Sequence, residues 1–358
     1  MSRATGENAS IAIRVHKKDA ESVLKRAIAM GALDRDRKVL DRDGYVEIPL
    51  RSPLPGYDPF PQVAPRFYRR QPDLAEALGE ALPGEAVRLL PRSWYILGGV
   101  IIVKIHPDLT PFQSQIGQAL LSCYPRCHTV LRDFGIDGPL REPVREVIAG
   151  GRTETIHREN GVLFKLDAKR VMFSAGNLGE RIRMAHLGRD EVVVDMFAGI
   201  GYFSLPMAVH SRPRRVFAIE LNPVAHSYLC ENIALNRVGK IVHPILGDCS
   251  EKAPEGIADR VVMGMVQFTD RYLRRGILAL RSGGVLHYHQ TVPSWRYPAD
   301  AVRDVKEAAE ALGLEACILG CTRVKKYSPG VVHAVVDAQI WSDPCREGLM
   351  RRSTSADR

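Results

Sequence analysis

The sequence has no apolar run of transmembrane length and no signal peptide at its start, so we expect neither a membrane span nor export. Cysteine is scarce: seven residues are scattered over a chain of 358, and their number is odd. These absences together predict a protein of the reducing cytoplasm.

Spacing typical of a zinc site is also missing. Cys123 and Cys127 form a Cys-x-x-x-Cys sequence with His128 beside it, but no second pair of ligands follows. A structural zinc ion usually takes four such ligands, so we expect no metal here. The cysteines are better explained as core or surface thiols.

Basic residues outnumber acidic ones. The formal net charge is +9 and the pI is about 9.2, which favours a polyanionic partner, with nucleic acid first. Tyr68, Arg69, Arg70 and Arg92 add aromatic and basic side chains to one part of the chain. This combination fits RNA contact, and it fits the solvated flank of a linker equally well.

The glycine pattern for a dinucleotide is incomplete. Residues 191–194 predict a short buried strand, which Asp195-Met-Phe-Ala-Gly199-Ile-Gly201 and a helix from about Tyr202 follow. Ser204 stands where a pyrophosphate-binding turn needs its third glycine. The stretch therefore favours a nucleoside without phosphates, and a glycine turn without any ligand is the alternative.

Acidic residues also end the next strands. Residues 216–220 predict a strand that ends at Glu220, whose carboxylate suits ribose hydroxyls. Asp248 follows the strand expected at 242–246 and is well placed for an adenine amine. Because strands alternate with helices and a hairpin closes the chain, we predict an α/β fold with a doubly wound, seven-stranded sheet and a closing antiparallel hairpin.

The expected domain organisation has five parts. They are a small α+β domain at 1–52, a proline-rich linker and helix at 53–90, a middle α+β domain at 91–168, a nucleoside-binding catalytic domain at 169–345 and a loose tail at 346–358. The first is too small to be a convincing enzyme alone, so we expect it to position a partner.

Polar residues precede the first strand of the expected sheet. Ser174 or Asn177 can cap the helix that starts there. Alternatively, these side chains grip the methionine end of a ligand, and Arg181 pairs with its carboxylate.

Several motifs together resemble one family. Asp195-Met-Phe-Ala-Gly199-Ile-Gly201 resembles motif I of class I methyltransferases, which bind S-adenosylmethionine. With Thr155-Ile-His-Arg-Glu-Asn-Gly161, Phe173-Ser-Ala-Gly-Asn177 and Ile219-Glu-Leu-Asn-Pro223, it resembles the archaeal and eukaryotic tRNA methyltransferases of the guanosine 3′ of the anticodon. It equally resembles their relatives, the wybutosine-synthesising aminocarboxypropyl transferases. The resemblance covers residues 10–341 and implies a class I methyltransferase-like Rossmann fold.

A few positions separate the two branches. The methyltransferase branch carries an Asn-x-Pro-type sequence after the fourth strand, where this chain has Met263-Gly-Met-Val-Gln267. That sequence, with His287-Tyr-His289, resembles the other branch. The resemblance implies transfer of the 3-amino-3-carboxypropyl group of S-adenosylmethionine to C7 of 4-demethylwyosine at position 37 of tRNA(Phe). N1-methylation of guanosine 37 is the alternative, and a tRNA-binding module with a relic pocket is a third reading.

The resemblance and the motifs together define the expected site residues. Those expected to contact the donor are Ser174, Arg181, Asp195, Phe197, Gly199, Gly201, Glu220, Asp248 and Cys249, the last through its backbone. Those expected to face the substrate are Asn177, Met263 and Gly264. His287 and His289 are candidates for the base that removes the proton from carbon, unless they are core histidines. We expect a monomer that binds the anticodon loop of tRNA.

Overall fold

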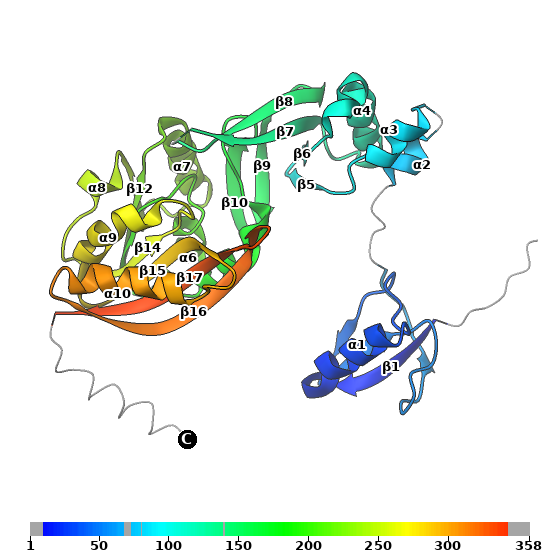
Figure 1. Ribbon diagram of the computed structural model, residues 1–358, viewed down its shortest axis with the longest axis horizontal. Coiled ribbons are helices and arrows are strands. Elements are labelled where there is room, and N and C mark those ends of the chain that lie inside the picture. The colour runs from blue at the N-terminus through cyan, green and yellow to red at the C-terminus, as the bar shows by residue number, and fades with distance from the viewer. Residues whose placement is uncertain (1–9, 68–72, 80, 139, 343–358) are drawn as a thin grey trace, which may run out of the picture. The chain divides into compact units, whose positions relative to one another are not determined.

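The computed structural model describes residues 10–67, 73–79, 81–138 and 140–342, which divide into two compact units after Asp73 (Figure 1). Tyr68, Arg69 and Arg70, considered above for RNA contact, and the tail expected at 346–358 lie outside the described residues. Within the described residues no helix has the length and hydrophobicity needed to span a membrane.

The first unit is a small antiparallel sheet with one long helix. Its strands follow the order β2-β3-β1-β4, and the core beneath the helix contains Ile13, Val23 and Ile48. Apolar residues alternate along the first strand, so one face of the strand packs against the helix. The elements are β1 (Ile11–His16), η1 (Lys17–Asp19), α1 (Ala20–Ala29), β2 (Leu40–Arg42), β3 (Tyr45–Pro49) and β4 (Phe60–Pro61).

The proline-rich segment expected as a linker belongs to this unit. β4 pairs with β1, and Leu54 is fully buried in the same core. The buried guanidinium of Arg37 donates to the side chain of Gln62 and to the carbonyl of Leu50, which ties the segment down. Proline is compatible with this position because β4 is an edge strand and needs no ladder donor on its outer side.

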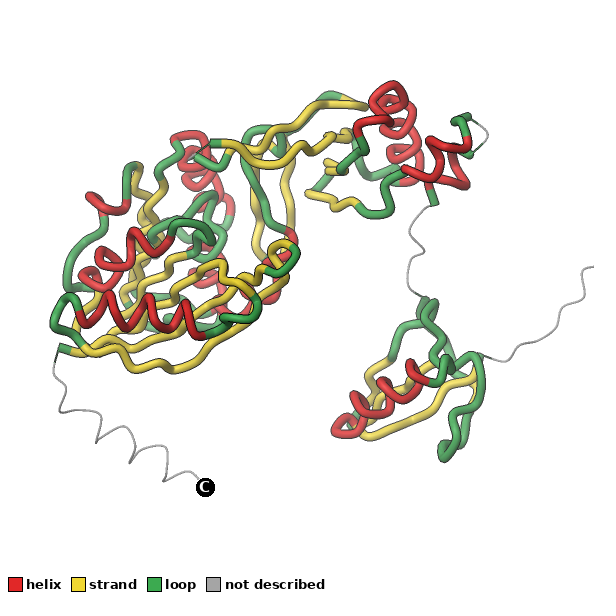
Figure 2. Tube along the Cα trace, viewed as in Figure 1, coloured by secondary structure: helices red, strands yellow, loops and turns green. Residues whose placement is uncertain are grey.

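The second unit begins with helices that pack on the four-stranded sheet β5-β6-β7-β8. Leu74 and Leu78 are buried in its core, so the helix expected within the linker is part of this packing. The strands β7 and β8 form a long ribbon (Figure 2). The elements are α2 (Leu74–Leu78), α3 (Gly84–Leu89), β5 (Trp94–Leu97), β6 (Val100–Val103), η2 (Pro107–Phe112), α4 (Gln113–Cys123), β7 (Thr129–Asp137) and β8 (Glu142–Gly150).

A hairpin of β9 (Glu154–Glu159) and β10 (Val162–Asp167) follows, and it confirms the turn predicted at Asn160-Gly161. Both turn residues have positive φ, as an Asn-Gly hairpin turn requires. The hairpin docks on α7 (Pro223–Leu235), where the Asn232 side chain bonds the backbone of Lys165 through both its oxygen and its nitrogen.

The largest sheet confirms the predicted doubly wound fold. Its order is β13-β12-β11-β14-β15-β17-β16, with parallel pairing from β13 through β15 and antiparallel pairing at β17 and β16. β15 is longer than predicted because it pairs with β17 over its whole second half. The strands are β11 (Val192–Asp195), β12 (Arg215–Glu220), β13 (Val242–Leu246), β14 (Ala258–Met263), β15 (Leu280–Pro293), β16 (Glu315–Ser328) and β17 (Val331–Trp341).

Helices cover both faces of this sheet, each with its own apolar core (Figure 1). One core includes residues of α5, α6 and α7, and the other includes residues of α9 and α10. The remaining elements are η3 (Ala175–Asn177), α5 (Leu178–Ala185), α6 (Ser204–His210), α8 (Cys249–Lys252), η4 (Thr269–Tyr272), α9 (Leu273–Ala279) and α10 (Ala299–Glu310). The carboxyl ends of the parallel strands remain available for a ligand, as is usual in such folds.

Candidate functional site

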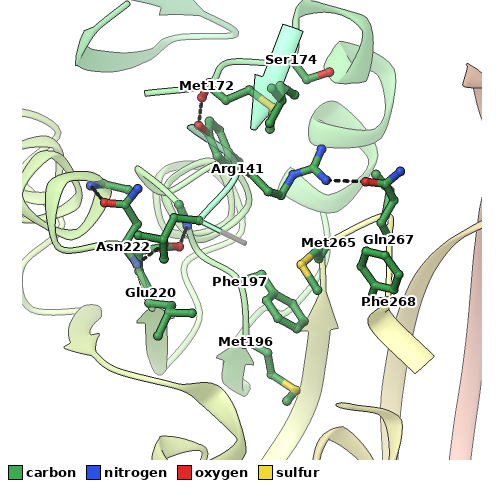
Figure 3. Close-up of a pocket in the computed structure, with 18 of the residues that line it drawn as sticks. Arg141, Met172, Ser174, Met196, Phe197, Glu220, Asn222, Met265, Gln267 and Phe268 are labelled. Atoms are coloured by element: carbon green, nitrogen blue, oxygen red, sulfur yellow. Dashed lines mark hydrogen bonds between the residues drawn. The ribbon is translucent and has the colours of Figure 1, made fainter. Parts of the chain in front are cut away.

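A cavity of about 840 Å³ lies at the carboxyl ends of the parallel strands, and we call it the strand-edge cavity. Figure 3 shows Glu220 and Asn222 on one side of it, Gln267 and Phe268 on the other, and Ser174 above. The expected site residues that line it are Ser174, Asn177, Arg181, Phe197, Gly199, Glu220, Asp248, Cys249 and Gly264. The structure thus brings together residues from five separate motifs.

The backbone geometry of the turn at 199–201 requires glycine at two positions. Gly199 and Gly201 have φ values of +58° and +104°, which side chains rarely tolerate. A Cβ at Gly199 would lie 2.2 Å from the Tyr202 ring, and one at Gly201 would lie 2.4 Å from Leu205. Gly201 does not line the cavity, so its role is helix packing, whereas Gly199 forms part of the wall.

Glu220 connects the ends of two strands. One carboxylate oxygen accepts a hydrogen bond from the Gly199 N–H (2.7 Å), and the other accepts from the Asn222 N–H (2.8 Å). Burial raises the pKa of Glu220, while these backbone donors oppose the rise. Each oxygen keeps a further lone pair, so the carboxylate can also accept hydroxyl donors from a ligand in the cavity.

Asp195 has a structural role instead of the donor contact expected from the sequence. It is 1% exposed and does not line the cavity. Its carboxylate accepts hydrogen bonds from the Ser204 hydroxyl (2.6 Å) and the Phe197 N–H (3.3 Å), which fix the turn to the start of α6. Burial raises the pKa of Asp195 to about 6.

The burial of Asp195 predicts a dependence of stability on pH. The folded-state pKa of Asp195, about 6, lies above the ordinary 3.8. The protonated side chain therefore stabilises the fold fully at low pH, and this stabilisation is lost as the pH rises from about 4 to 6. We expect the free energy of unfolding of the wild type, relative to Asp195→Asn, to fall by roughly 2–3 kcal/mol between pH 4 and 7. Urea denaturation at several pH values measures this difference, and a constant difference would contradict the assignment.

Arg181 is held within the protein. Its guanidinium donates to both oxygens of Glu159 (2.5 and 2.8 Å) and to the backbone oxygen of Ser174 (2.9 Å). Burial acts to raise the pKa of Glu159, but hydrogen bonds from His157 and Arg181 outweigh it and hold the value at about 2. The Arg181–Glu159 pair therefore carries no net charge at neutral pH, although Arg181 lines the cavity.

Three residues expected near the chemistry lie in the core. Met263 is fully buried and packs beneath α9, so the prediction that it faces the substrate is wrong. The His287 ring lies between Asp337 (2.6 Å) and Arg260 (2.5 Å), and the His289 ring contacts His333 (3.1 Å). Burial lowers the pKa of both His287 and His289, and neither lines the cavity, which disfavours both as the base.

The cavity also contains residues that sequence reasoning did not select. Arg141, in the turn between β7 and β8, donates to the Gln267 side chain (3.0 Å). Lys325, on β16, donates to the Ser174 hydroxyl (2.9 Å). Both come from segments distant along the chain, so the sequence carried no local signal for them. Phe268, which follows the fourth predicted strand, has a positive φ of 59° and is 60% exposed at the cavity.

The described residues contain no group of three His, Cys, Asp or Glu side chains placed to hold a metal ion. Their cavity instead offers carboxylates, amides and apolar walls, which suit an organic ligand.

Three stretches of the chain match known families of domains. Residues 155–317 match the TRM5/TYW2 methyltransferase domain, residues 74–153 the TYW2 N-terminal domain, and residues 12–58 the tRNA methyltransferase 5 N-terminal domain. Over 246 residues the chain is 46% identical to the tRNA(Phe) (4-demethylwyosine(37)-C(7)) aminocarboxypropyltransferase of Methanocaldococcus jannaschii, which covers 68% of this chain and 96% of that protein.

Solved structures agree with these matches. The crystal structure of P. horikoshii TYW2 in complex with MeSAdo has a TM-score of 0.68 and 36% identity, covering 76% of this chain and all of that one. Trm5b from Pyrococcus abyssi has a TM-score of 0.67 and 33% identity, covering 93% and 99%. The chain therefore belongs to the TRM5/TYW2 family of tRNA-modifying enzymes.

Proposed function

We propose that this chain transfers the 3-amino-3-carboxypropyl group of S-adenosylmethionine to C7 of 4-demethylwyosine at position 37 of tRNA(Phe), releasing methylthioadenosine. This choice rests on the residues that line the cavity directly after β14. Gly264, Met265 and Val266 line the cavity there, in place of the Asn-x-Pro-type sequence of the methylating branch. The similarity to the Methanocaldococcus jannaschii aminocarboxypropyltransferase supports the same choice.

The residues of the strand-edge cavity fit the donor. Glu220 offers acceptors for the ribose hydroxyls, and Asp248 offers an acceptor for the adenine amine. Asp248 also accepts the Ser250 N–H (2.8 Å), which orients its carboxylate at the start of α8. Phe197 and the backbone of Cys249 complete the expected nucleoside contacts.

Orientation decides which group is transferred. The bound donor supplies a sulfonium whose three attached carbons are all electrophilic, and the methyl is the least hindered. The protein must therefore hold the aminocarboxypropyl Cγ against C7 of the base and turn the methyl away. Such positioning can contribute up to roughly 7–11 kcal/mol to lowering a barrier. The C–S bond breaks toward a neutral thioether, so no general acid is needed, and the C7 proton leaves to a base that we do not assign.

Charged and aromatic side chains around the cavity support contact with RNA. The exposed cations that line it are Lys104, Arg170, Arg271 and Lys326. They suit phosphates of the anticodon loop. Phe268, with the Arg271 guanidinium 4.7 Å from its ring centroid, suits stacking with an unstacked base. We infer that the first unit positions the tRNA and that the enzyme acts in the cytoplasm as a monomer, for which light scattering should give a mass near 39.8 kDa.

Labelled donor tests the proposal. The chain is incubated separately with tRNA(Phe) that carries 4-demethylwyosine and with tRNA(Phe) that carries unmodified guanosine 37, and the donor carries label either in its carboxyl carbon or in its methyl carbon. We expect carboxyl label in the tRNA and no methyl label. Methyl label in unmodified tRNA would support N1-methylation of guanosine 37 instead, and absence of both labels would favour a binding module.

A further inference from the structure

Lys325 is a partly buried cation without a carboxylate partner. It extends from β16 into the strand-edge cavity, and its ammonium group donates to the Ser174 hydroxyl at 2.9 Å. It forms no ion pair with an acidic side chain anywhere in the described ranges of the chain. Burial lowers the pKa of Lys325, and the positive charges of Arg181 and Arg141 lower it further. An anion in the cavity would relieve both effects.

The other cations of the cavity are less suited to that anion. Arg181 is neutralised by Glu159 through two hydrogen bonds. Arg141 donates to the Gln267 side chain at 3.0 Å, so part of its guanidinium is already engaged (Figure 3). Lys326, one residue along β16, is exposed, as are the cations proposed above to contact phosphate. Lys325 is therefore the cation that lies against the segment expected to hold the methionine end of the donor.

That segment also offers an unfilled acceptor. The side-chain oxygen of Asn177 is buried in the lining of the cavity, and it has no hydrogen-bond donor among the described residues. A Cβ placed on Gly176 would lie 3.3 Å from the Lys325 ammonium, so the lysine lies directly against this turn. A cation, a hydroxyl and an open amide oxygen thus lie in one corner of the cavity. Their chemistry complements an α-amino acid group, which carries a carboxylate and an ammonium.

We propose that Lys325 binds the carboxylate of the donor's 3-amino-3-carboxypropyl group, with Ser174 donating to the same carboxylate and Asn177 accepting from the ammonium. This inference rests on the proposed function and assigns a part of the same cavity. Arg181 then has a supporting role, since it holds the Ser174 carbonyl and the Glu159 side chain in place. Because the transferred carbon lies at the other end of the group that Lys325 anchors, this contact helps to decide which carbon beside the sulfur meets the base.

Binding of two ligands can distinguish the Lys325 contact from the contacts that the cavity makes with the nucleoside. S-Adenosylmethionine carries the aminocarboxypropyl group, whereas methylthioadenosine has the same nucleoside and lacks that group. We expect Lys325→Ala to weaken binding of S-adenosylmethionine by roughly 10- to 100-fold, as loss of a charge-assisted hydrogen bond should. Binding of methylthioadenosine should change by less than about threefold, because Lys325 does not contact the nucleoside. Isothermal titration calorimetry on the full chain without tRNA measures both affinities.

Matched variants complete the experiment. Lys325→Arg should recover most of the affinity for S-adenosylmethionine, and Lys306→Ala on α10 should leave both affinities unchanged because its side chain is exposed and does not line the cavity. If Lys325→Ala binds S-adenosylmethionine as the wild type does, or loses affinity equally for both ligands, the inference is overturned while the proposed function stands. If the wild type binds neither ligand, both the inference and the proposed function fail.

Discussion

Glu220→Gln is expected to weaken binding of S-adenosylmethionine by roughly 30- to 1000-fold, or about 2–4 kcal/mol. The two carboxylate oxygens accept different backbone N–H groups, from Gly199 and Asn222, and an amide can satisfy only one of them. The NH₂ group of the glutamine would then face the N–H group of either Gly199 or Asn222, and two hydrogen-bond donors cannot pair. The variant therefore loses both the shape of the glycine turn and an acceptor for the ligand. Calorimetry with S-adenosylmethionine and with methylthioadenosine should show similar losses, because Glu220 serves the nucleoside.

Asp195→Asn is the matched control for that measurement. It is the same carboxylate-to-amide change at a buried strand end, but Asp195 does not line the cavity. Its partners are one N–H and the hydroxyl of Ser204, and a hydroxyl can reverse its role and accept from an amide. We expect donor affinity within about threefold of wild type. An equal loss in both variants would mean that the turn, and not the Glu220 carboxylate, limits binding.

Asp337→Ala is expected to lower the free energy of unfolding by about 3–5 kcal/mol, because it removes hydrogen bonds to the charged Arg183 guanidinium and to the buried His287 ring. The Asp337 carboxylate bonds Arg183 at 2.6 Å and His287 at 2.6 Å. Burial acts to raise the pKa of Asp337, but His287 and Arg183 outweigh it and hold the value at about 2. This folded-state pKa lies below the ordinary 3.8, so the stabilisation is present above about pH 4 and is lost as the pH falls toward 2.

Urea denaturation at pH 7 and at pH 3 measures the effect of Asp337→Ala. Glu307→Ala on α10 removes a carboxylate that is 68% exposed and only 3.8 Å from Arg303, so it should cost less than about 0.5 kcal/mol. A loss for Asp337→Ala no larger than for Glu307→Ala would show that the buried pairs contribute little. A difference that grows toward pH 3 would contradict the direction of the pKa shift.

The sequence was most informative where function and local structure use the same residues. Glu220 was predicted because an acid at a strand end is visible in the order of residues, and the hairpin turn at Asn160-Gly161 because its backbone needs those residue types. Both follow from neighbours along the chain. The doubly wound sheet was predicted for the same reason, since alternation of strands and helices is a local pattern.

Burial of the side chains on β15 was not predictable from such local patterns. His287 and His289 lie on one face of β15, and a polar residue at a strand end can face either a cavity or the core. Only the packing of α5 and β17 decides this, by bringing Asp337 to His287 and Glu180 near His289. Lys325 was missed for a similar reason, because Ser174 is 151 residues away along the chain.

The contact of Arg141 with Gln267 has a consequence for how this enzyme can be dissected. One of the two apolar cores that cover the seven-stranded sheet also contains Leu97, Leu131 and Phe164, so a fragment from Lys169 onward would lose part of that core. It would also lack Glu159, which neutralises Arg181, and the turn that bears Arg141. The segment upstream of Lys169 is therefore a component of the enzyme in both its packing and its cavity, and deletion variants should keep the chain from Leu74 onward in one piece.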